Sequence, residues 1–130
     1  MRVNTVFTIN YIVAFIFAAV FIIMPAFGLE MMGLNPEGAA PIYARGWGAF
    51  ILGVSALAFF SRNLSKSEGR RAVLLSLFFS YIFLVIYNIY QNFIAGIPIN
   101  LMFVLLYIVH IGFAALYGYF LFGSPREIDV

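Results

Sequence analysis

Four apolar stretches, each about as long as a membrane is thick, constrain this chain more than any other feature of its sequence. A helix needs about 20 apolar residues to cross roughly 30 Å of hydrocarbon. Four segments have that length: residues 3–24, 41–61, 72–93 and 100–122. Lipid cannot satisfy exposed backbone groups, and four segments are too few to close a barrel, so each must be a helix. The sequence therefore predicts an all-α integral membrane four-helix bundle, with residues 1–130 as a single transmembrane domain.

Composition indicates the same class, because 65% of the residues are apolar and only 9% are charged. A soluble domain has about 25% charged residues, and a soluble core of this size could not bury so much apolar surface. The net charge of +2 is too small to indicate a nucleic acid partner. Because the chain has no cysteine, disulfides and thiolate metal sites are excluded.

Prolines and glycines mark the ends of the predicted helices. Pro25 ends the first, because proline cannot continue a helical hydrogen-bond ladder. Pro41 stands at the first position of the second, where proline is tolerated. A tight turn through Gly96 and Pro98 joins the last two spans, which predicts an antiparallel hairpin. The more polar segment 26–40 fits a short amphipathic turn at the membrane surface.

The basic residues predict the orientation. With a cytoplasmic N-terminus, the outer side holds Arg45 alone. The inner side then holds all the others, namely Arg2, Arg62, Lys66, Arg70, Arg71 and Arg126. This bias predicts that both termini are cytoplasmic, and it argues against insertion in two opposite orientations. The first span could instead be a cleaved signal peptide, but Met24-Pro25-Ala26-Phe27 is a poor cleavage site.

Polar side chains follow one face of each of the last two spans at helical spacing. On the third span they are Ser76, Ser80, Asn88 and Gln91. On the fourth the row is Asn100, Tyr107, His110, Ala114 and Tyr117. Because the two spans form a hairpin, we expect the rows to face each other. The plain interpretation is hydrogen bonding between helices, at about 0.6 kcal/mol per bond. The functional alternative is a small ligand pocket formed by Arg45, Asn88, Tyr107 and His110.

The histidine is the deepest strongly polar group of the fourth span. Counted at 1.5 Å per residue from the outer ends of the spans, Asn88 should lie roughly 7 Å nearer the surface than His110. A direct bond between them would need tilt, side-chain reach or a bridging water. We therefore expect His110 to bond Tyr81, Ser80 or a backbone carbonyl. In the first span, Asn10 is polar and well inside, and Ala14 and Ala18 continue its face.

The second span carries a row of small residues that predicts close packing against another helix. The row is Gly46, Ala49, Gly53 and Ala56. Arg45 lies near the start of the same span, and three roles are open for it. Its side chain can reach the headgroups, pair with Glu30 or Glu37, or bind an anionic ligand group.

The chemistry available inside the spans argues against an enzyme. All five carboxylates lie outside the four spans, and the chain has one histidine. Paired acids for acid–base catalysis are therefore missing from the spans, and no cluster has metal-ligand spacing. We expect no cofactor and no metal, although a lipid- or quinone-modifying enzyme using Arg45, Asn88 and His110 stays open.

The second span also carries a family likeness. Its string Ala44-Arg45-Gly46-Trp47-Gly48-Ala49, continuing to Gly53, resembles the Arg-x-x-Gly plus second-glycine helix of the DoxX-like group. The positions that match are Arg45, Gly48 and Gly53, and the order of elements is similar along the whole chain. The resemblance implies a four-helix bundle in a prokaryotic inner membrane. Some members of that group are associated with quinol oxidation or other respiratory redox systems.

Taken together, the sequence favours a multi-pass membrane protein that binds a hydrophobic ligand, a lipid or a quinone, or a partner membrane protein. An oligomeric channel or transporter, lined by the polar row of the third span, is the alternative from another class. The third alternative is the small lipid- or quinone-modifying enzyme. The expected partners are the lipid bilayer, a lipid or quinone, and another membrane protein or a second copy of the chain, with no nucleic acid.

Overall fold

The structure is a computed structural model that describes residues 2–65 and 67–123. Within those residues the regular secondary structure is entirely helical. It comprises α1 (Val3–Ile23), α2 (Pro25–Met31), α3 (Ala40–Ser61), α4 (Glu68–Phe93), α5 (Leu101–Gly118) and the π-helix η1 (Tyr119–Gly123). By length and composition, α1, α3, α4 and α5 with η1 can each cross a membrane. The predicted all-α class and the four long apolar spans are confirmed. Lys66 and Arg126, used above for the orientation, lie outside the described residues.

The structure differs from the prediction at two places, the start of α4 and the segment after the first span. α4 begins at Glu68, four residues before the apolar stretch, since the Ser67 hydroxyl accepts a hydrogen bond from the backbone N–H of Arg70. The segment after the first span is a helix and not only a turn. Pro25 ends α1 and at the same time occupies the first position of α2, where its missing N–H is harmless.

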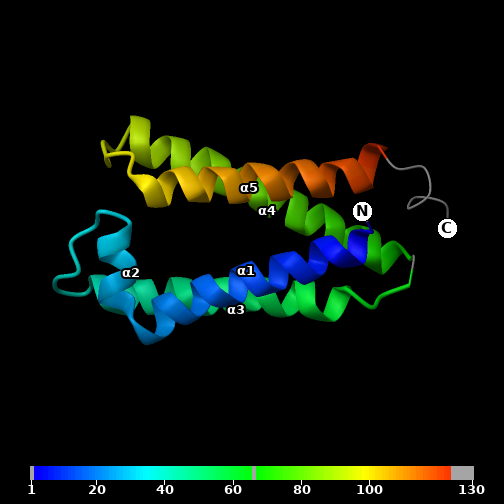
Figure 1. Ribbon diagram of the computed structural model, residues 1–130, viewed down its shortest axis with the longest axis horizontal. Helices are drawn as coiled ribbons and strands as arrows, with labels where there is room; N and C mark the ends of the chain where they lie inside the picture. Colours follow the sequence, from blue (N-terminus) through cyan, green and yellow to red (C-terminus); the bar gives the residue numbers. More distant parts are fainter. Residues whose placement is uncertain (1, 66, 124–130) are drawn as a thin grey trace.

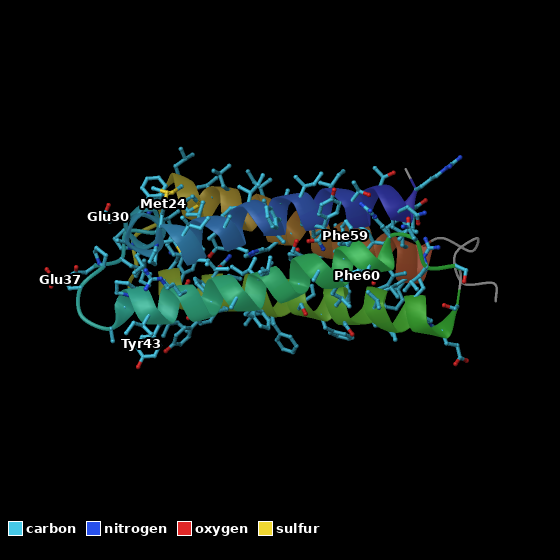
Figure 2. All side chains as sticks on the ribbon, turned by 90° about the horizontal axis from the view of Figure 1, so that it is seen from below. Met24, Glu30, Glu37, Tyr43, Phe59 and Phe60 are labelled. Carbon is cyan, nitrogen blue, oxygen red and sulfur yellow. The ribbon has the colours of Figure 1, made fainter. Side chains whose placement is uncertain are left out.

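The four long helices lie side by side in two pairs (Figure 1). α1 packs closely along α3, and α4 packs along α5, whereas the contacts between the two pairs are sparser. The start of α1 and the loop residues 62–65 and 67 lie at one end, here called the N-terminal end (Figure 1). The other end, the α2 end, holds α2 and the turn 94–100, and Figure 2 shows Glu30 and Glu37 there as well. The predicted antiparallel hairpin is confirmed for α4 and α5.

The core consists of two apolar clusters. At the N-terminal end, buried residues of α1, α4, α5 and η1 meet, among them Val6, Phe7, Leu77, Phe113, Tyr117 and Phe120. The cluster at the α2 end is formed by Phe21, Leu29, Met32, Ala44 and Phe103. The outer surface is also apolar, and Tyr43, which is 76% exposed, points outward in Figure 2. Such a surface is suited to hydrocarbon and not to water.

The small-residue row predicted to pack α3 faces away from the other helices, so that prediction is wrong. Gly46, Ala49, Gly53 and Ala56 are all exposed, and a methyl group added at Gly46 or Gly53 would have no neighbour within 4 Å. The close approach is made by Gly48 instead. A methyl carbon there would lie 2.8 Å from Cγ1 of Ile22 and 3.1 Å from the carbonyl oxygen of Ala18. Two small faces run along α3, and residue size alone cannot tell which one meets α1.

Candidate functional site

A cavity of about 200 Å³ lies between the two helix pairs, and all five α-helices contribute to its walls. Most of the wall is apolar, including Phe17, Phe21, Trp47, Ile51, Leu84 and Leu106. No charged side chain is among the described residues that line it. Ile16 and Phe50 belong to the wall and are 56% and 61% exposed, so the cavity reaches the apolar outer surface at α1 and α3.

Asn88 on α4 and His110 on α5 form the polar part of this wall. Nδ2 of Asn88 lies 3.0 Å from Nδ1 of His110. Asn88 is 2% exposed and His110 is 9% exposed, so both side chains are more than nine-tenths buried. The expectation that His110 bonds Tyr81, Ser80 or a carbonyl is therefore wrong. The depth estimate treated the helices as parallel, whereas α4 is inclined to α5 (Figure 1).

The amide nitrogen of Asn88 faces the imidazole, and this orientation indicates where the imidazole proton lies. An amide nitrogen can only donate, so Nδ1 of His110 accepts and the ring carries its proton on Nε2. Neither Nε2 of His110 nor Oδ1 of Asn88 has a hydrogen-bond partner among the described residues. The pair therefore retains an acceptor, Oδ1 of Asn88, and at least one donor, Nε2–H of His110, and the second N–H of the amide is a further donor.

A second buried polar group, the Asn10 cluster of Asn10, Tyr81 and Tyr117, ties together α1, α4 and α5. The Tyr81 hydroxyl donates to Oδ1 of Asn10 at 2.6 Å, and Nδ2 of Asn10 donates to the Tyr117 hydroxyl at 2.6 Å. Tyr81 also lines the cavity, and its ring centroid lies 5.8 Å from that of His110. Sequence reasoning placed Asn10 on the correct face, because Ala14 and Ala18 are buried with it.

Sequence reasoning named Tyr81 as a possible partner of His110 but did not include it in the polar row of the third span. It stands seven residues, or about two helical turns, before Asn88 and so lies on the same face of α4. That spacing could have placed it in the polar row. The two serines of that row do not join helices, because Ser76 donates to the carbonyl of Ala72 and Ser80 to that of Ser76. A helical serine readily bonds the carbonyl one turn earlier.

The other two residues of the predicted pocket lie elsewhere. The Tyr107 hydroxyl donates to Oδ1 of Asn92 at 3.0 Å, near the turn between α4 and α5. Arg45 is exposed and is not part of the cavity wall. Glu30 and Glu37 are described, and neither forms an ion pair with Arg45. The structure thus brings Asn88 and His110 together in the cavity wall, and Tyr107 and Arg45 are not part of that wall. A binding role for any of the four stays a prediction.

Gln91 lies one turn from Asn88 toward the α2 end and is buried. Its Oε1 has no hydrogen-bond partner among the described residues. Over the same residues, no three histidine, aspartate or glutamate side chains are grouped to hold a metal ion.

Comparison with known proteins gives a match to a protein family. Residues 1–124 match the model of a protein family described as a domain of unknown function, DUF8292. The match spans all four long helices and every residue of the cavity wall. No curated protein and no solved structure matches the chain. The resemblance to the DoxX-like group stays an expectation.

Proposed function

The chain belongs to the DUF8292 family, whose description gives no function, and from its cavity we propose that it binds a small hydrophobic ligand within the membrane. In this proposal the four long helices form one membrane-spanning bundle. The ligand lies between the α1–α3 pair and the α4–α5 pair. Asn88 and His110 hold its polar group.

The orientation in this proposal follows the basic residues. Arg62, Arg70 and Arg71 lie at the N-terminal end of the molecule, whereas Arg45 lies on the first turns of α3 toward the α2 end. Basic residues are retained on the cytoplasmic side. The N-terminal end is therefore cytoplasmic, and the α2 end, with Glu30 and Glu37, faces the opposite side.

The observation that carries the proposal is a largely apolar cavity with a buried polar pair in its wall. Ligand sites are typically concave and apolar, with a few polar groups that fix orientation. An apolar cavity of about 150 Å³ binds one benzene molecule, so 200 Å³ holds one ring or a short alkyl segment. The exposed wall residues Ile16 and Phe50 give a longer apolar tail a way toward the surrounding lipid.

The position of the cavity supports binding in preference to conduction by a single chain. Its walls take residues from both core clusters, and the clusters lie at its two ends. The buried side chains of Phe7 and Tyr117 on one side, and Phe103 on the other, fill the ends of the molecule. An apolar molecule entering sideways from the lipid is therefore better accommodated than an ion crossing from end to end.

The test is recovery of bound apolar molecules from protein purified out of native membranes. Ala14 lines the cavity, whereas Ala49 is exposed on the outer face of α3. Ala14→Leu should fill part of the cavity and abolish recovery of the ligand, as read by extraction and mass spectrometry. Ala49→Leu adds the same atoms to the outside and should leave recovery unchanged. If both variants retain the ligand equally, it does not occupy this cavity.

A further inference from the structure

We infer that the ligand of this cavity is a neutral, ring-sized apolar molecule that carries a hydroxyl group, an alcohol or a phenol. The inference rests on the proposed function and adds the chemical class of the ligand. It follows from three features of the wall: the absence of charge in its described part, the hydrogen-bonding atoms that remain free, and the size of the cavity.

The lack of charge in the wall restricts the ligand to neutral molecules. The residues described around the cavity include no lysine, arginine, aspartate or glutamate. A charge transferred from water into such a place loses its hydration and gains no counter-charge. Arg45, the basic residue nearest in sequence to the wall residue Trp47, is exposed outside the wall. A carboxylate or phosphate group is therefore disfavoured inside.

The free atoms of the polar pair require a ligand that can both accept and donate. With the amide as it stands, Nε2–H of His110 donates and Oδ1 of Asn88 accepts. Turning the Asn88 amide over would make Nδ1 the donor within the pair, and would leave Nε2 as acceptor and the amide N–H as donor. Either arrangement leaves at least one donor and at least one acceptor. Both side chains are more than nine-tenths buried, so little water competes for these atoms.

A hydroxyl is the smallest neutral group that meets both requirements. A ketone or an ether can only accept, and it leaves the acceptor of the pair unsatisfied in an apolar site. A hydrocarbon leaves both atoms unsatisfied. Sites that contain buried hydrogen-bonding groups discriminate strongly against ligands that lack the matching group. The volume of about 200 Å³ sets the apolar part near one aromatic ring.

Three probes of nearly equal size separate these cases: 4-fluorophenol, 4-fluoroanisole and 4-fluorotoluene. The first donates and accepts, the second only accepts, and the third does neither. Binding is measured by ¹⁹F NMR on the full chain in lipid nanodiscs, with empty nanodiscs as the control for partition into lipid. The phenol is neutral near pH 7, since a phenolic hydroxyl has a pKa of about 10. We expect the phenol to bind roughly tenfold more tightly than the anisole, as one additional buried hydrogen bond allows.

A variant that lacks both polar groups tests whether the pair causes the preference for the phenol. In the double variant Asn88→Leu/His110→Phe, the advantage of the phenol over the toluene should fall below about twofold, since both hydrogen-bonding groups are lost while apolar bulk is kept. The wild-type probe series decides the inference even if this variant does not fold. Equal binding of all three probes would overturn the hydroxyl requirement and leave the proposed ligand cavity standing. If no probe binds beyond its partition into empty nanodiscs, the cavity proposal and this inference both fail.

Discussion

Gly48 and Gly53 lie five residues apart on α3. Replacing each by alanine should change the free energy of unfolding differently, with a loss at Gly48 and no loss at Gly53. At Gly48 the new carbon would lie 2.8 Å from Cγ1 of Ile22, 3.0 Å from Cβ of Phe21 and 3.1 Å from the carbonyl oxygen of Ala18. None of these atoms is at the far end of a flexible side chain, so α1 and α3 must move apart. Overpacking of this kind lowers the free energy of unfolding by about 1–3 kcal/mol.

At Gly53 a methyl group would meet nothing within 4 Å. There alanine should be neutral or should stabilise the helix by up to about 1 kcal/mol, through its higher helix propensity. Thermal unfolding in mild detergent measures both variants. At roughly 4 °C per kcal/mol for a chain of this length, Gly48→Ala should lower Tm by about 4–12 °C. Equal losses in the two variants, or a larger loss for Gly53→Ala, would refute this account of α1–α3 packing.

Three further predictions follow from buried polar groups and from the charge distribution. Asn10→Leu removes the partner of two tyrosine hydroxyls and should lower the free energy of unfolding in detergent by about 1–3 kcal/mol. The control Thr8→Ala removes an exposed bond within one helix and should leave that free energy unchanged. Gln91→Met removes a buried unpaired acceptor and should raise the same free energy by roughly 1 kcal/mol; a lower value would mean that Oε1 is satisfied in the membrane. In the natively cysteine-free chain, Glu37→Cys should react with an impermeant thiol reagent outside intact cells and Ser65→Cys should not; the reverse pattern would invert the proposed orientation.

The elements of this fold were predictable from the sequence because length and hydropathy alone determine a membrane-spanning helix. The spans predicted at residues 3–24 and 41–61 correspond within one residue to α1 and α3. The early start of α4 was harder to predict, because it depends on the cap formed by Ser67. Hydropathy indicates which part of a helix can lie in lipid, whereas a cap determines where the helical hydrogen bonds begin.

The contacts between helices were only partly predictable, because they depend on which face of a helix is turned inward. For α3 the row containing Gly53 and the face containing Gly48 are both rich in small residues, and the packing selects the second. For α5 the sequence correctly predicted that the row through His110 and Tyr117 faces inward. The partner of His110 was not predicted, because it depends on the inclination of α4. The spacing of residues along one helix gives no information about that inclination.

The Asn10 cluster has a consequence for how the protein is made. The partners of Asn10 lie 71 and 107 residues later in the chain. At about 5–20 residues per second, a ribosome needs roughly 5 to 20 seconds to synthesise 107 residues. Through that interval Nδ2 of Asn10 lacks its acceptor on Tyr117, whereas the Tyr81 hydroxyl that bonds Oδ1 is synthesised earlier, 71 residues after Asn10. α1 is the most apolar of the four spans, which offsets this polar group. The first helix to be synthesised can thus form its last bond of this cluster only when synthesis has passed Tyr117 on α5.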